Sequence, residues 1–309
     1  MDISKEWRSW VLGFNFEPAP DASCHENTMS SFFPPEILDL IVDHLHDEQT
    51  TLRACCLVSK SWVPRTRIHL FNCVSFSSSG PTLKSWMQTF PDPSNSPTRY
   101  TRILHLSDFK AVTVAISDAR PWVQSFNHIV DLRVVTIGLN DPHISFNQLR
   151  RLSPTLKSLQ LFCSFAPLPE ILDCVCSFPL LEDLSLCSVI PRVQENVTKW
   201  NTPPTSPKFT GSLFMSCKNR DIARELLALP GGLHFSKLTV VCPIGDGNLS
   251  KELVSACSDT LKSLTIDFYR GAFSLLSVAD QYLIFSLQIC PGLGYHLQLT
   301  SPRPQNSKT

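Results

Sequence analysis

Cysteine and histidine are the residue types in this chain that could do chemistry, as metal ligands or as catalytic groups. The 309 residues include twelve cysteines and nine histidines. Cys174 and Cys176 are separated by one residue and no Cys-x-x-Cys pair occurs, which is not the spacing of a metal site. His44 and His46 are two positions apart and cannot share one face of a helix. We therefore expect no metal site.

Motifs for nucleotide binding and hydrolysis are equally weak. The glycines of Gly245-Asp246-Gly247 resemble part of a phosphate loop, but no Gly-Lys-Ser/Thr follows, and a turn explains them. The sequence contains neither a Gly-x-Ser-x-Gly elbow nor a His-Glu-x-x-His helix. A hydrolase with a dispersed triad stays an alternative that would require a concave pocket with a nucleophile and a base. We expect a protein that is not an enzyme and has no cofactor.

Charge and hydropathy exclude two further classes of function. Lysine plus arginine equals aspartate plus glutamate at 27 each, so no overall field would attract nucleic acid or an anionic membrane. The apolar stretch from Gly271 to Cys290 is broken by Asp280 and Gln281, and the N-terminus lacks a secretory signal. With most cysteines inside apolar runs, the chain is expected in the reducing cytosol or nucleus.

A change in pattern divides the N-terminal third of the chain. Residues 1–31 show no sustained period and are interpreted as an extension. From 32 to 76, apolar residues recur at helical spacing in three short stretches, the first opened by Pro34 and Pro35. Residues 77–99 are rich in proline and small polar residues and predict a linker around one helix at 82–89. We expect a small three-helix module followed by a second domain.

Short apolar runs then return at a nearly constant interval. Two of them, Thr155-Leu-Lys-Ser-Leu and Thr260-Leu-Lys-Ser-Leu, are identical. The interval of 25 to 29 residues is typical of leucine-rich repeats, in which each unit contributes one strand and a returning helix or turn. The central leucines of the seven runs are Leu104, Leu132, Leu159, Leu184, Leu213, Leu238 and Leu264.

Residues 100–299 are therefore predicted to form a leucine-rich-repeat-like solenoid with a parallel sheet, and 300–309 a polar tail. The fold class is α/β. Helical spacing in 169–177 and 220–229 predicts helices on the convex side. The fifth unit is irregular, and the last strand is expected at Tyr295–Leu299.

The helical module carries a recognisable combination of short motifs. Phe33-Pro-Pro-Glu-Ile-Leu38 is followed by Val58-Ser-Lys-Ser-Trp62 and then by Leu70-Phe71. In order and spacing these resemble the F-box, whose pattern runs Leu-Pro-x-Glu-Ile/Leu-Leu, Val-Ser-Lys/Arg-x-Trp, Leu-Phe. Phe33 stands where leucine is common. The resemblance covers the module alone.

The resemblance implies binding to the Skp-family adaptor of an SCF-type cullin ubiquitin ligase. F-box proteins often carry a leucine-rich array that holds the protein to be ubiquitinated. For Ile41 and Leu57, closing the three-helix core is an equal alternative to adaptor contact. Carried over onto matching positions, the expected adaptor contacts are Pro34, Ile37, Leu38, Ile41, Leu57, Val58 and Trp62.

In such an array the outward strand positions would recognise an unknown protein target. For each of them an ordinary solvated surface residue is the alternative. A repeat scaffold that does not engage the ligase is the alternative for the whole chain, and exposure of the apolar helix faces would separate the two. The target-facing candidates, flanked by Asp131, Asp183, Lys237 and Asp267, are His105, Arg133, Gln160, Ser185, Thr239 and Thr265.

Overall fold

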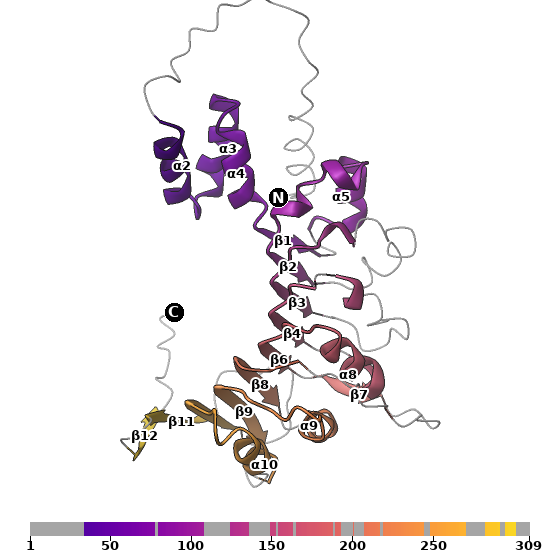
Figure 1. The fold of residues 1–309 in the computed structure, drawn as a ribbon, viewed down its shortest axis with the longest axis vertical. Coiled ribbons are helices and arrows are strands. Elements are labelled where there is room, and N and C mark those ends of the chain that lie inside the picture. Colours follow the sequence, from indigo (N-terminus) through magenta and orange to yellow (C-terminus); the bar gives the residue numbers. More distant parts are fainter. Residues whose placement is uncertain are drawn as a thin grey trace, which may run out of the picture. The chain divides into compact units, whose positions relative to one another are not determined.

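The computed structural model divides into two compact units, 1–129 and 130–309 (Figure 1). The expected extension 1–31, Phe33 and the end of the polar tail lie outside the described residues. Of β11 and β12, at 282–300, only the backbone is described. The described residues are 34–77, 80–107, 124–135, 149–152, 154–162, 165–187, 189–192, 200, 207–216, 219–243, 248–269, 282–290 and 294–300.

Three short helices are the first elements that the structure describes, as predicted for the module. They are α2 (Pro35–His44), α3 (Gln49–Val58) and α4 (Val63–Leu70). Proline occupies the first turn of α2, where its missing amide hydrogen costs no intrahelical bond, and Glu36 in the same turn favours the helix dipole. Their small core is buried and consists of Val42, Leu52, Cys55, Cys56 and Thr66.

The other described residues of the first unit include a packed aromatic core. Strand β1 (Cys73–Phe76) pairs in parallel with β2 (Ile103–Leu106), and helix α5 (Leu83–Thr89) lies between them in the chain, followed by the 3-10 helices η2 (Pro93–Asn95) and η3 (Pro97–Tyr100). Trp86 is fully buried among Phe76 and Phe126 and donates from Nε1 to Ser96 Oγ at 3.2 Å. The helix predicted at 82–89 is confirmed, and the expected linker 77–99 proves to be packed structure.

Six strands of the second unit run parallel to one another in one sheet, and a short 3-10 helix, η4 (Leu149–Arg151), precedes the second of them. The predicted α/β class and parallel sheet are confirmed. A separate parallel pair joins β5 (Phe165–Pro167) and β7 (Ile190–Arg192). In chain order and as neighbours, the six strands are β3 (Asp131–Val135), β4 (Ser158–Phe162), β6 (Asp183–Cys187), β8 (Ser212–Ser216), β9 (Lys237–Pro243) and β10 (Ser263–Tyr269).

The leucines that recur every 25 to 29 residues in the sequence lie side by side on neighbouring strands of this sheet. Each pairs with the leucine one repeat away, and none is more than 8% exposed. Alternation along each strand directs these side chains into a common interior and their neighbours to the other face. The row, in register from β3 to β10, is Leu132, Leu159, Leu184, Leu213, Leu238 and Leu264.

Helices return the chain between strands along one side of the stack (Figure 1). Helix α8 (Leu168–Cys176) precedes β6, α9 (Arg220–Leu227) precedes β9, and α10 (Asn248–Ala256) precedes β10. The helices predicted within 169–177 and 220–229 are thereby confirmed. Each helix buries a stripe of apolar residues that are three or four positions apart. The stripes include Ile171, Leu172 and Val175; Ile222, Ala223 and Leu226; Leu249 and Leu253.

A repeated main-chain arrangement precedes the strands. The amides of Glu182 and Asp183 both donate to the carbonyl of Lys157, at 2.8 and 2.9 Å. At β8 only Gly211 donates to the carbonyl of Glu182, which agrees with the irregular fifth unit expected from the sequence. Four further carbonyls accept two such hydrogen bonds each, those of Asn72, Val130, Gly211 and Ser236.

The sheet of the second unit ends differently from its repeats. Strand β11 (Tyr282–Cys290) pairs antiparallel with β10, and β12 (Gly294–Thr300) pairs antiparallel with β11. The strand predicted at Tyr295–Leu299 is confirmed, but its direction departs from the parallel array that we expected up to 299. Three residues separate the two strands, which is too short a connection for a parallel crossover.

Candidate functional site

Helix α2 carries two apolar stripes, and one of them is uncovered. Val42 is buried, and Leu38 one turn before it is half-buried. On the other stripe Ile37, Leu40 and Ile41 are 41%, 54% and 43% exposed. Because Ile37 lies three and four positions before the other two, these three side chains share one face of the helix.

The end of α3 is still more open. Leu57 is 78% exposed and Val58 69% exposed, although both are large apolar residues. Their predecessors Cys55 and Cys56 are buried in the helical core, as is Leu52 one turn earlier. Helix α4 adds Ile68, which is 38% exposed. These side chains cannot be explained as parts of the core of the first unit.

The six residues Ile37, Leu40, Ile41, Leu57, Val58 and Ile68 are called here the apolar helix surface. They comprise all but one of the exposed large apolar side chains in the described residues, and the exception is Leu180 in the second unit. Apolar exposure concentrated in three short helices of a folded protein is typical of a binding surface. The surface is carried by three helices within 37 positions of the sequence from Pro34 to Leu70.

Most expected adaptor contacts are accessible, with two exceptions. Pro34, Ile37, Ile41, Leu57 and Val58 are exposed. Core closure, which we held open for Ile41 and Leu57, is therefore not their role.

Leu38 and Trp62 are the two exceptions, because both are only half-exposed. The carbonyl of Trp62, the residue just before α4, accepts hydrogen bonds from the amide and the hydroxyl of Thr66. Leu40 and Ile68 belong to the apolar helix surface but were missed from the sequence. The spacing of three residues from Ile37 could have identified Leu40.

A charged cluster joins α2 to α4. Asp43 accepts two hydrogen bonds from Arg65 and one from His69 Nε2 at 2.8 Å. These bonds, that of Arg65 first, hold the pKa of the Asp43 carboxyl well below its usual range. The same contact raises the pKa of Arg65. The cluster thus orients the helix that carries Ile37, Leu40 and Ile41.

The outward strand face of the second unit brings together five of the six target-facing candidates. They lie in one row across neighbouring strands, in which Phe214 stands between Ser185 and Thr239, and all five are half-buried. His105, the sixth, lies in the first unit, where it pairs with Ser75. The row runs Arg133, Gln160, Ser185, Phe214, Thr239 and Thr265, and Phe214 is the member that we did not predict.

Phe214 is the largest apolar side chain of this row. Its position follows from the buried Leu213 before it, so strand alternation could have identified it. A half-exposed aromatic ring among polar neighbours is a common anchor in protein interfaces.

The flanking charged residues differ in their surroundings. Arg133 NH2 donates to Asp131 at 3.3 Å, whereas Asp183 accepts from the amide and hydroxyl of Ser212 at 2.6 Å each. Lys237 is exposed. Burial raises the pKa of Asp267. The outward face is thus a mixed polar and apolar surface without a dominant charge.

Two findings concern other classes of site. No helix in the described ranges is both long and apolar enough to cross a membrane. Within those same ranges, no three side chains of the metal-binding types gather into one group. Comparison with known proteins adds no assignment, because no protein-family model matches the chain and no curated protein is similar to it.

Proposed function

We propose that this chain is the substrate receptor of an SCF-type cullin ubiquitin ligase, acting in the cytosol or nucleus. Its helical module would bind the Skp-family adaptor in the manner of an F-box. Its strand array would hold the protein to be ubiquitinated. The chain itself would carry no catalytic group.

The observation that carries the proposal is the apolar helix surface. Three short helices bury only a few side chains and leave Leu57 and Val58 more than two thirds exposed. Exposure of so much apolar area costs free energy unless a partner covers it, at about 25 cal/mol per Å². A scaffold without an adaptor has no need to keep this face open. The F-box-like motif lies on these same helices, which is why the adaptor is the proposed partner.

The second unit suits the other half of the role. Parallel strands stacked in register present the row from Arg133 to Thr265 as a continuous face. Such an array recognises a protein through many weak polar contacts around a few anchors. We propose Phe214 as the apolar anchor and Arg133 as a charged contact of this face.

Equilibrium binding of a purified Skp-family adaptor to the full chain tests the proposal. The variant Leu57→Asp with Val58→Asp places two charges on the most exposed part of the surface. We expect its affinity to fall at least about thirtyfold, the effect of losing an interface hot spot. Because both side chains are exposed, the variant should keep the native fold, which circular dichroism checks.

Leu180→Asp is the control, because it places a charge of the same sign on the exposed large apolar residue of the described residues that lies outside the module. It should bind the adaptor like the native chain. Failure of the folded native chain to bind the adaptor would contradict the proposal. Equal binding by the native chain and the double variant would also contradict it.

A further inference from the structure

The last two strands of the second unit continue its leucine row. Leu264 of β10 pairs with Leu287 of β11, and Leu287 pairs with Leu297 of β12. Because paired residues of an antiparallel ladder occupy the same face of a sheet, alternate positions of both strands lie on the face of the leucine row. These positions carry only aliphatic or aromatic residue types and are Leu283, Phe285, Leu287, Ile289, Tyr295, Leu297 and Leu299.

No described helix follows the leucine row beyond β10. Among the described helices α10 is the last, and it precedes β10. Three residues connect β11 to β12, which is less than one helical turn. Each unit of a repeat array buries its apolar face against a neighbour, and the end of an array needs a cover of its own. No described helix is available as the cover for the apolar positions of β11 and β12.

Strand β12 also ends the sheet. It pairs with β11, and no other strand of the described residues pairs with it. Alternate residues of such a strand direct their N–H and C=O groups to the edge away from its partner, where a further strand can pair. Charged residues or proline within the strand commonly prevent this pairing. The sequence from 282 to 300 contains no lysine, arginine, aspartate or glutamate, and its proline, Pro291, lies in the connection between the strands.

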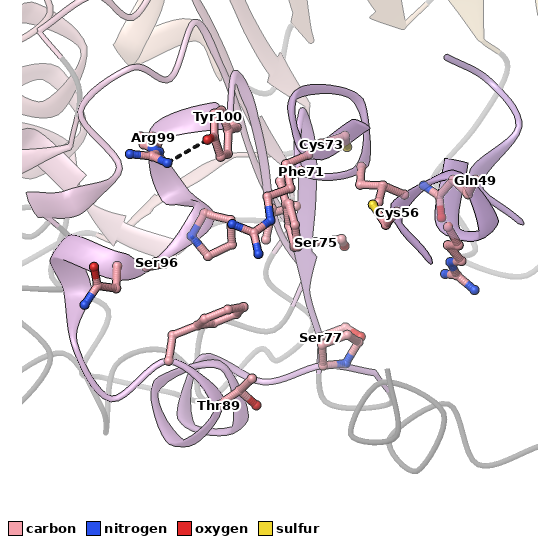
Figure 2. Close-up of a pocket in the computed structure, with 18 residues that line it drawn as sticks. Gln49, Cys56, Phe71, Cys73, Ser75, Ser77, Thr89, Ser96, Arg99 and Tyr100 are labelled. Carbon is pink, nitrogen blue, oxygen red and sulfur yellow. Dashed lines mark hydrogen bonds between the residues drawn. The ribbon is translucent and has the colours of Figure 1, made fainter. Parts of the chain in front are cut away.

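The first strand of the first unit has different surroundings. Strand β1 pairs with β2, and its residues Cys73 and Ser75 line a cavity of about 410 Å³. Other walls of this cavity contain Gln49 of α3 and Arg99 of η3 (Figure 2), whereas β2 contributes no lining residue. Helical elements therefore lie around β1, which is one way in which proteins protect an edge strand. No such element accompanies β12 in the described residues.

We propose that β12 pairs with β12 of a second copy of this chain, so that the sheet continues through a symmetric dimer. This association is separate from the proposed ligase role. Identical strand edges can pair antiparallel about a twofold axis, which is the commonest symmetry of homodimers. The register that pairs all seven residues of Gly294–Thr300 places Leu297 beside the same residue of the second copy.

This register matches the pattern of β12 with itself. Tyr295 lies opposite Leu299 of the second copy, and His296 lies opposite Gln298, so apolar positions pair with apolar positions and polar positions with polar ones. The twofold axis is perpendicular to the sheet, and both leucine rows therefore lie on the same side of the joined sheet.

The absence of charge favours a second copy over a partner with a charged strand. A neutral edge meets its own copy without repulsion between like charges. A charged strand would find no opposite charge between 282 and 300 and would lose solvation on pairing. Because a ladder of seven residues is a small interface, we expect a reversible dimer with a Kd in the micromolar range.

Sedimentation equilibrium of the full chain under reducing conditions tests the proposal. We expect a monomer–dimer equilibrium for the native chain. The double variant His296→Lys with Gln298→Lys places like charges directly opposite each other across the twofold axis, on the face away from the leucine row. Its dimerisation should be at least about tenfold weaker.

Ser286→Lys with Gln288→Lys is the matched control, because these residues pair with Gln298 and His296 on β11 and lie one strand away from the edge. It should dimerise like the native chain. A native chain that stays monomeric up to about 100 μM would overturn the proposal. Dimerisation that both double variants keep, or that both lose, would also overturn it. Circular dichroism checks that each variant keeps the native fold.

A thiol introduced on the twofold axis tests the register. Two copies of Leu297→Cys should form an intermolecular disulfide on mild oxidation, because paired residues of an antiparallel ladder have the Cα separation that a disulfide needs. Leu299→Cys is the control, since Leu299 lies opposite Tyr295 and hence four positions from its own copy. Peptide mass spectrometry separates the introduced link from links between native cysteines. An equal yield from the two variants, or no link in Leu297→Cys, would overturn the proposed pairing.

Neither experiment involves the adaptor or a target protein. Both therefore succeed or fail independently of the proposed ligase role.

Discussion

Arg65 holds Asp43 through two parallel hydrogen bonds, from Nε to Oδ1 at 2.6 Å and from NH2 to Oδ2 at 2.5 Å. The paired geometry fixes the carboxylate in one orientation, and His69 adds a third contact on Oδ1. The pair joins residues 22 positions apart, one in α2 and one in α4. Because α2 has a single buried apolar residue, this pair is a main determinant of where the helix lies.

Asp43→Asn should therefore loosen α2. The side chains of Asp43 and Arg65 are 33% and 37% exposed, so solvent weakens the ion pair, and we expect a loss of about 1 kcal/mol of unfolding free energy. Chemical denaturation at neutral pH measures this loss. Glu36→Gln is the control, because Glu36 is an exposed acidic residue on the same helix. It should change the free energy of unfolding by less than about 0.5 kcal/mol. Equal stability of Asp43→Asn and the native chain would contradict this role of the pair.

The same cluster predicts a response to acid. Folding lowers the pKa of Asp43 from its ordinary value of 3.8, so ionised Asp43 stabilises the folded state. This contribution is complete above the ordinary value and is lost as the pH falls below it toward the folded pKa. We expect the stability difference between the native chain and Asp43→Asn to be constant from neutral pH to about pH 5 and to shrink below about pH 4. A difference that shrinks between pH 7 and pH 5 would assign the effect to another group.

The leucine row predicts where the second unit is most sensitive. Leu159 is fully buried in register with Leu132 and Leu184, so Leu159→Ala should cost about 2–5 kcal/mol through lost burial and a cavity. Gln160→Ala, on the opposite face of the same strand, should cost less than about 0.5 kcal/mol. Denaturant unfolding of the two variants measures the difference. Similar costs would contradict the assignment of the two faces.

At Gly211, in the irregular repeat, the backbone lies close to Asp183 and Glu182. A Cβ atom there would meet the carboxylate of Asp183 and lie 3.0 Å from the carbonyl of Glu182. Gly211→Ala should therefore destabilise the unit by about 1–3 kcal/mol. Since Asp183 is one side of the clash, combining the change with Asp183→Ala should cost less than the sum of the two single changes. An additive result in unfolding experiments would contradict the predicted clash.

Cysteine reactivity should separate buried from exposed thiols. Burial raises the pKa of Cys174 to about 12, which removes the reactive thiolate at neutral pH. Cys73 is exposed. We expect iodoacetamide to label Cys73 in the native chain at pH 8 and to label Cys174 only after unfolding, as followed by peptide mass spectrometry. Early labelling of Cys174 would show that the core around α8 is not closed.

The strand array could be predicted because its signal is local and repeated. Each run places one leucine at the same point of a buried strand, so the interval between leucines reports the stacking directly. Phe214 was missed because its run was noted for irregularity, although alternation after Leu213 determines its face. The antiparallel end could not be predicted, since strand direction depends on the length of connection and not on apolar pattern.

The exposure of Leu57 could not be predicted for a different reason. Helical spacing identifies apolar stripes, but which stripe remains uncovered depends on how the three helices pack.

Amide hydrogen exchange of the full chain, with and without a saturating Skp-family adaptor, tests the central claim most directly. It reports binding and its location in one measurement. We predict slower exchange in α2 and in the last turn of α3, with exchange in α8, α9 and α10 unchanged. Unchanged exchange throughout the helical module, or protection confined to the strand array, would contradict the assignment of the apolar helix surface to the adaptor.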